Sequence, residues 1–126
     1  MRKIIFLTTI ILVTILTSKA QLSEDVVIAM KNGNVPELSN HFNNEIELII
    51  LDKENVYSKN QAAVILKDFF SKNPIEDFEI KHQGDKENMH YVIGNLITEN
   101  GVFRISLILK SSNNINLIHQ LRIENE

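Results

Sequence analysis

The 126-residue chain contains no cysteine, and this absence excludes several kinds of chemistry. There can be no disulfide, no thiolate nucleophile, no cysteine-based metal site and no lipidated cysteine. Because no covalent link joins distant parts of the chain, we expect the domain to be stabilised by its own hydrophobic core.

Motifs for several cofactors and reactions are also lacking. The four histidines, His41, His82, His90 and His119, do not have the close spacing of zinc ligands. The chain has no nucleophile elbow, no phosphate-binding loop and no dinucleotide fingerprint. We therefore predict no metal site and no cofactor and assign no catalytic residue. The sequence leaves open whether the protein is an enzyme, although it favours a non-enzyme.

Basic residues are fewer than acidic ones. The chain has 13 Lys and Arg against 16 Asp and Glu, which gives a net charge of −3. Three of the basic residues, Arg2, Lys3 and Lys19, lie within the first 20 positions, so the remainder has a net charge of −6. An acidic domain repels nucleic acid phosphates and anionic lipid surfaces. We therefore expect neither nucleic acid nor a lipid surface as a partner.

Residues 1–20 have the pattern of a secretory signal peptide. Two basic residues open the chain, an uncharged apolar stretch follows, and Ser18 precedes a cleavage site between Ala20 and Gln21. The apolar stretch is shorter than the ~18 residues expected of a transmembrane helix. We predict export to the periplasm or the medium, a single mature domain of residues 21–126, and no membrane attachment after cleavage.

Capping residues mark the predicted helices. Ser23 is a typical N-cap, the apolar residues after it lie on one helical face, and Asn32-Gly33 ends that helix. A short second helix is expected directly afterwards. Ser58 and Gln61 form a capping box that opens a longer amphipathic helix, which ends before Pro74.

Strands dominate the rest of the chain. Residues 45–51 and the return at 56–57 predict a hairpin between the helices. After Pro74, alternating apolar residues predict four further strands in an antiparallel meander, with Asn100-Gly101 as a tight turn. This order predicts an α+β domain in which the helices pack on the one apolar face of the sheet.

Several short motifs match a known family in their order and spacing. They are Gln61-Ala62, Phe69-Phe70, His82-x-Gly84, Tyr91 with Gly94, Gly101, and Phe103-Arg104. Through them the chain, from about Asp25 to Glu124, resembles a secreted bacterial family, domain-of-unknown-function family 4783, within the nuclear transport factor-like superfamily, also called the cystatin-like cone.

The resemblance implies a fold and no single function. It implies a curved antiparallel sheet of four to six strands wrapped around the N-terminal helices. The family has no assigned activity, and the superfamily ranges from isomerases and dehydratases to binding and assembly modules. Fold alone therefore does not decide the function.

Four side chains are predicted to line the cavity of such a cone: His82, His119, Tyr57 and Tyr91. Strand alternation places both histidines on the apolar face. A histidine there can act as a general base, because its ordinary pKa of ~6.5 lies near the working pH. The commoner interpretation is a core histidine that is hydrogen-bonded to a backbone carbonyl or a tyrosine.

Other charged residues on the strands are less well placed for such a cavity. Asp77 and Glu79 have the opposite alternation and are expected to face water, whereas the orientation of Glu47 stays ambiguous. Arg104 is expected on the other face of the sheet, paired with Glu99 or at an interface. This pattern disfavours a carboxylate base of the isomerase type.

Two function hypotheses follow. The first is a non-catalytic exported module that binds a small apolar ligand in the cavity, or forms a homodimer through the open sheet face near Ser106, Ile108 and Ile118. The second is a small hydrolase or isomerase that uses His82 or His119 in the cavity.

Overall fold

The computed structural model describes residues 22–126, so the predicted signal peptide (1–20) and the cleavage site at Ala20 and Gln21 lie outside the described residues. This part of the chain forms three helices: α1 (Glu24–Asn32), α2 (Val35–Ser39) and α3 (Lys59–Lys72). The same residues, 22–126, form six strands: β1 (Phe42–Ile50), β2 (Lys53–Ser58), β3 (Ile75–Lys86), β4 (Met89–Thr98), β5 (Gly101–Ser112) and β6 (Ile115–Asn125).

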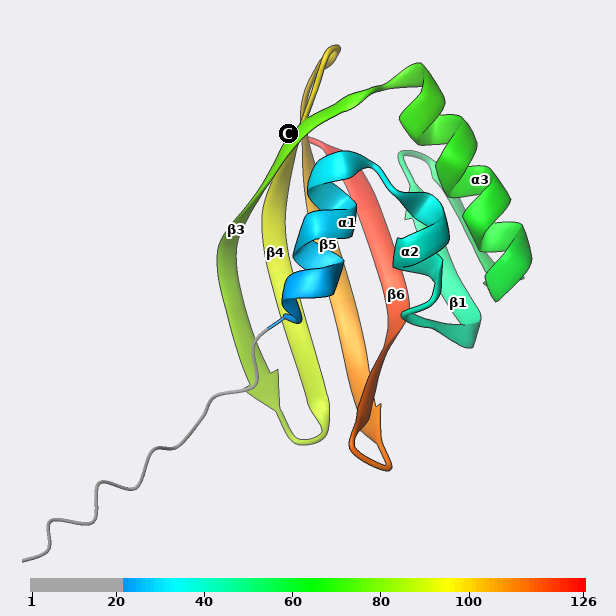
Figure 1. Ribbon diagram of the computed structural model, residues 1–126, viewed down its shortest axis with the longest axis vertical. Helices are drawn as coiled ribbons and strands as arrows, with labels where there is room; N and C mark the ends of the chain where they lie inside the picture. Colours follow the sequence, from blue (N-terminus) through cyan, green and yellow to red (C-terminus); the bar gives the residue numbers. More distant parts are fainter. Residues whose placement is uncertain (1–21) are drawn as a thin grey trace, which may run out of the picture.

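The six strands form one sheet in the order β2-β1-β6-β5-β4-β3. All neighbours are antiparallel except β1 and β6, which run parallel. The parallel pair arises because α3 takes the chain from one edge strand, β2, to the other, β3, and the meander then returns to β1 (Figure 1). The α+β fold is confirmed, with a mixed six-strand sheet.

The helix ends follow the predicted capping residues. The Ser23 hydroxyl accepts a hydrogen bond from the Val26 N–H, and Gly33 ends α1 with a φ of 61°. Ser58 and Gln61 form the predicted capping box of α3, since each side chain accepts from the backbone N–H of the other residue. These caps satisfy N–H groups that the helices themselves leave unpaired.

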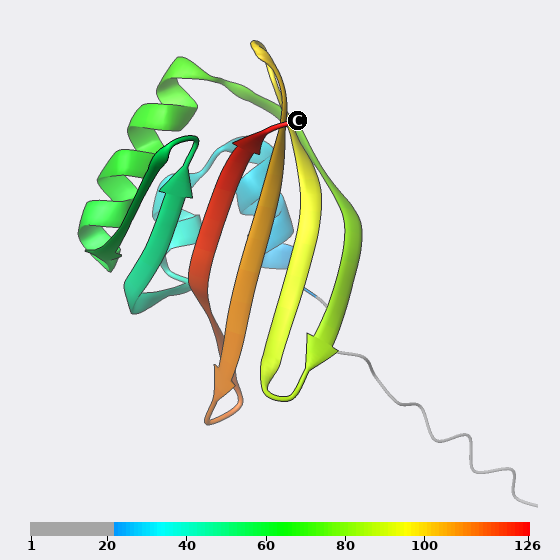
Figure 2. The same ribbon diagram turned by 180° about the vertical axis from the view of Figure 1, so that it is seen from behind.

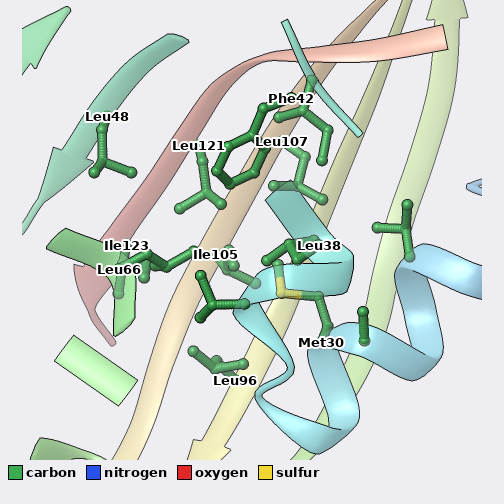
Figure 3. Close-up of a cluster of buried hydrophobic side chains, with 14 of the residues drawn as sticks. Met30, Leu38, Phe42, Leu48, Leu66, Leu96, Ile105, Leu107, Leu121 and Ile123 are labelled. Carbon is green, nitrogen blue, oxygen red and sulfur yellow. The ribbon is translucent and has the colours of Figure 1, made fainter. Parts of the chain in front are cut away.

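The helices all lie against one face of the sheet, which we call the inner face. Figure 1 shows α1 and α2 in front of the strands and α3 beside β1, and Figure 2 shows the opposite, outer face without any helix. Hydrophobic side chains fill the space between the helices and the inner face (Figure 3). Each fully buried aliphatic or aromatic side chain contributes about 1.5–3 kcal/mol to this core.

Strand β4 shows the two faces most clearly. Its residues alternate without interruption between half-buried and buried positions, and Val92, Leu96 and Thr98 point inward. His90 has the same inward alternation and is only 5% exposed. The outward residues of β4 are Met89, Tyr91, Ile93, Asn95 and Ile97.

Two of the irregularities in strand pairing, one in β3 and one between β5 and β6, reverse the alternation at the predicted histidines. In β3, Ile80 pairs with Gly94 but His82 pairs with Ile93, so Lys81 is an extra residue. Residues directly opposite one another in a sheet share a face, and a bulge shifts all later residues to the other face. His82 therefore lies on the outer face with Ile93, and its predicted position on the apolar inner face is wrong.

A second bulge has the same effect in β6. Ile108 pairs with Gln120 and Leu109 pairs with Ile118, so His119 is the extra residue. Ile118, which was expected on the outer face, is fully buried in the core. His119 lies with Ile108 and Gln120 along a groove of the outer face, and its predicted inner position is wrong as well.

Candidate functional site

The four predicted cavity residues do not converge on one site. His82 and Tyr91 lie together on the outer face, and His119 borders a separate groove of that face. Tyr57 is the one predicted residue on the inner side, because it pairs with the buried Ile46 and lines a pocket beneath α3. These four residues thus mark three separate places within residues 22–126.

The His82–Tyr91 pair explains two of the family-like motifs. The His82 Nε2 atom lies 3.2 Å from the Tyr91 hydroxyl, and the two rings are tilted against each other. A Cβ atom at Gly84 would come within 2.6 Å of that hydroxyl, so glycine makes room for the tyrosine ring. Since His82 is exposed, the pair forms a surface contact.

His119 borders an outer groove of about 360 Å³ that Glu47 and Lys110 also line. Partial burial, and secondarily the nearby Lys110 charge, hold the pKa of His119 below its ordinary value. A hydrogen bond with Glu54, followed by desolvation and the Glu54 charge, raises the pKa of Glu47. The groove therefore holds a neutral imidazole at neutral pH, on the side of the sheet that no helix covers.

The inner face contains a histidine cluster that the sequence analysis did not single out. The Asp85 carboxylate accepts a hydrogen bond from Nδ1 of buried His90 at 2.7 Å, and the Gln83 Oε1 atom lies 2.9 Å from its Nε2. Gln83 Oε1 also accepts from the Leu22 backbone N–H at 3.1 Å. The uninterrupted alternation of β4, which groups His90 with Val92, was the signal that could have found it.

This cluster is suited to a structural role. A histidine oriented by a carboxylate is the usual arrangement of a general base. Here, however, the second ring nitrogen faces an oxygen that already accepts the Leu22 N–H, so no ring nitrogen is free for a ligand. The cluster instead ties the start of α1 to the β3–β4 hairpin. The catalytic hypothesis required a cavity histidine, and neither His82 nor His119 lies on the inner side.

A mostly apolar pocket lies between α3 and the β1–β2 hairpin. Its volume is about 370 Å³, which is at the lower end of the range for small-molecule sites. Its walls are largely apolar, with Leu48, Ile50 and Tyr57 from the hairpin and Ile65 and Phe69 from α3. Leu48 and Phe69 belong to the core, so the pocket lies at the edge of the core, where α3 stands beside β1 and β2 (Figure 1).

The mouth of this pocket is charged and structurally fixed. Asp68 and Lys72 of α3 lie on one side and bind each other, with 3.0 Å between the carboxylate and the amine. The turn of Leu51, Asp52 and Lys53 forms the other side. Leu51 has a φ of 55°, which is costly for a leucine, and its N–H donates to the Ile123 carbonyl at 2.9 Å.

Two other charged residues considered in the sequence, Glu79 and Arg104, differ in their ion pairs. Glu79 lies exposed on the outer face and pairs with Lys81 at 3.2 Å. Arg104 also lies on the outer face, but no ion pair joins it to Glu99 in residues 22–126; the nearby ion pair is between Arg122 and Glu124. In that same part of the chain, no group of three or more His, Asp or Glu side chains is arranged to hold a metal ion.

The matches to known proteins agree with this geometry. The family model described as Domain of unknown function (DUF4783) matches residues 23–124. A DUF4783 protein from Bacteroides ovatus is 34% identical, with a TM-score of 0.80 over 83% of this chain and 96% of that one. One from Bacteroides fragilis is 33% identical, with a TM-score of 0.80 over 84% of this chain and 100% of that one. The chain belongs to the DUF4783 family.

More distant structures show the fold alone. An NTF2-like protein of unknown function from Cytophaga hutchinsonii is 10% identical, with a TM-score of 0.58 over 83% of this chain and 91% of that one. No curated protein matches the chain. None of the helices within residues 22–126 has the length and apolar character needed to cross a membrane.

Proposed function

We propose that this protein is an exported, non-catalytic binding module that holds a small apolar ligand in the pocket between α3 and the β1–β2 hairpin. The observation that supports this function is the pocket itself, with its volume of about 370 Å³ and its walls of Leu48, Ile50, Ile65 and Phe69. A preformed apolar hollow with a few polar groups is the usual form of a small-molecule site.

The export part of the proposal is supported by the sequence of residues 1–20. Their basic start, apolar stretch and small residues are typical of a signal peptide. Sequencing the N-terminus of the protein from its native cells tests this directly. We expect the first residue to be Gln21, and an uncut Met1 would show that the segment is retained.

A pair of substitutions on α3 tests the binding function. Ile65 is half-buried and lines the pocket, whereas the preceding residue, Val64, is 69% exposed and does not line it. Ile65→Trp fills the pocket, and Val64→Trp adds the same ring to the surface. We expect native mass spectrometry of the protein from its own cells to show a bound small molecule that Ile65→Trp loses and Val64→Trp keeps. A bound mass that survives Ile65→Trp would contradict the proposed site.

Self-association through the outer face is a second candidate. Beside polar groups, this face has half-buried apolar side chains without a covering layer (Figure 2): Met89, Tyr91, Ile93, Ile97 and Ile108. Uncovered apolar patches of this kind mark interaction surfaces. The strand edges are less suited to pairing, since the Asn55 side chain occupies the Val56 N–H and the Asp77 side chain occupies the Phe78 N–H, each at 2.8 Å.

Sedimentation at micromolar concentration tests this second candidate. We expect a dimer for the unchanged protein and a monomer for Ile93→Asp, which places a charge in the middle of the apolar patch on β4. The control is Val64→Asp, which introduces the same charge at an exposed position on the opposite side of the sheet. A strictly monomeric unchanged protein would rule the dimer out.

A further inference from the structure

We infer that the pocket beneath α3 selects a ligand with a carboxylate head and an apolar tail, with Lys53 as the residue that binds the head. This inference rests on the proposed function, because it names the class of ligand for the same pocket. It depends on where the strand register places Lys53, on how the other charges at the mouth are used, and on what lies deeper in the pocket.

The register of the hairpin turns Lys53 toward the pocket. Lys53 pairs with Ile50, and Tyr57 pairs with Ile46, so these residues share the inner face of the sheet. Lys53, Ile50 and Tyr57 all line the pocket. The amine therefore stands at the mouth, on the same side as the apolar walls, while the intervening Glu54 belongs to the outer face.

The two charged residues of α3 at the mouth pair with each other. Lys72 and Asp68 bind each other at 3.0 Å, so this pair contributes little net charge to the mouth. Lys53 takes part in none of the ion pairs of residues 22–126. Asp52 also lines the pocket and takes part in none of these ion pairs, but it lies in the turn itself, before the first paired residue of β2. Lys53 is thus the amine at the mouth that is open to an anionic group.

Two further features favour a carboxylate head. Tyr57 lines the same pocket, and its phenol can donate a second hydrogen bond to an oxygen anion. The turn that positions Lys53 is held by the Leu51 N–H, which donates to the Ile123 carbonyl at 2.9 Å. This bond fixes the backbone from which the Lys53 side chain extends, so less backbone entropy is lost when a ligand binds. The tail would lie against the apolar walls formed by Ile65 and Phe69.

A series of ligands with one tail and three heads tests the inference by isothermal titration calorimetry. The probes are decanoate, decanol and decyltrimethylammonium, each below its micelle concentration. We expect decanoate to bind about tenfold more tightly than decanol, as a charge-assisted hydrogen bond predicts. The cationic probe should bind most weakly. Lys53→Met, which keeps the apolar stem and removes the charge, should abolish the preference for decanoate.

Matched variants separate the head group from the pocket. Lys67→Met removes the same charge from an exposed position of α3 that does not line the pocket, and it should leave the preference unchanged. Tyr57→Phe should weaken decanoate binding about threefold and leave decanol binding unaltered. Ile65→Trp should reduce binding of all three probes. Thermal unfolding of each variant checks that it is folded.

The possible results separate this inference from the proposed function. Equal affinity for decanoate and decanol, both lost in Ile65→Trp, would overturn the carboxylate preference while supporting an apolar binding pocket. Tighter binding of decyltrimethylammonium would overturn the choice of Lys53 and indicate Asp52 as the residue that binds the head. Failure of every probe to bind the folded protein would overturn the inference together with the proposed function.

Discussion

The inner face of the sheet is covered by three helices and buries large apolar side chains, whereas the outer face, made by the same strands, holds ion pairs, His82, His119 and half-buried apolar residues (Figures 1 and 2). A side chain on the inner face is surrounded by rigid backbone and packed side chains. Adding or removing one atom there therefore changes the packing of the core. On the outer face the neighbours are flexible side chains and water. The two faces should therefore respond very differently to the same substitution.

The largest difference is expected for truncation of an apolar side chain. Phe42 is 1% exposed and lies in the centre of the core (Figure 3), whereas Val56 on the outer face is 58% exposed. Phe42→Ala should lower the free energy of unfolding by about 4 kcal/mol through lost burial and the cavity left behind. Val56→Ala should change it by less than about 0.5 kcal/mol. Chemical denaturation measures both, and a similar cost for the two would contradict the expected difference between the inner and outer faces.

Two glycines of the β3–β4 pair allow the same comparison with one added methyl group. A Cβ at Gly94 would lie 2.4 Å from the backbone carbonyl oxygen of Glu79, which cannot move without disturbing the sheet. A Cβ at Gly84 would meet the far end of the Tyr91 side chain, which can rotate away. We expect Gly94→Ala to cost about 3 kcal/mol and Gly84→Ala about 1 kcal/mol. The reverse order in denaturation would contradict this assignment of the two faces.

The histidines provide the next test, because the histidine of the inner face is buried and that of the outer face is exposed. Buried His90 contacts Asp85 at 2.7 Å and Gln83 at 2.9 Å, whereas exposed His82 contacts only the Tyr91 hydroxyl. His90→Ala should cost about 2 kcal/mol, since it removes a buried ring together with its contacts to Asp85 and Gln83. His82→Ala should cost less than about 0.5 kcal/mol.

Hydrogen exchange can show whether the His90 contacts act as described. In His90→Ala, the Leu22 amide should exchange faster, because Gln83 Oε1 loses the ring that holds it in place. His82→Ala should leave that amide unchanged. Unaltered Leu22 protection in both variants would show that the cluster does not hold the start of α1.

More of the fold than of the candidate site could be predicted from the sequence. Capping residues such as Ser23 and Ser58 act through the backbone within one turn, so their local pattern was sufficient. The faces of His82 and His119 depend on bulges at Lys81 and at His119 itself, and a bulge depends on the pairing of two strands. Strict alternation therefore gave the wrong face for both histidines.

The pocket could not be predicted from the sequence, for a related reason. Its walls come from β1, β2 and α3, and its existence depends on how far α3 stands from the hairpin rather than on any local motif. Tyr57 was predicted to line a cavity, and it borders this pocket, but Lys53 falls between the predicted hairpin strands at 45–51 and 56–57 and was not expected there. The pairing of Lys53 with Ile50 is what places the amine on the inner side.

The smallest expected effect is a dependence of stability on pH that arises from the outer face. Partial burial and Lys110 hold the pKa of His119 below 6.5 in the folded protein, so the unfolded chain binds this proton more readily. Stability from this residue is complete above pH 6.5 and falls as the pH drops toward the lower, folded pKa. His119→Gln should flatten the decline in stability between pH 7.5 and pH 5.

Glu47 should act in the opposite direction and in a more acidic window. Contact with Glu54 raises its pKa above 4.5 on folding, so the folded protein binds this proton more readily. Its charge destabilises the fold above the raised pKa, and that penalty is relieved as the pH falls through the raised pKa toward 4.5. Glu47→Gln should therefore raise stability at neutral pH relative to pH 4, the reverse of the His119→Gln profile.

Because both groups lie on the uncovered face, salt should weaken both effects, whereas the cost of Phe42→Ala should not depend on salt. Identical pH profiles for the two variants would show that the outer groove does not shift these groups in opposite directions.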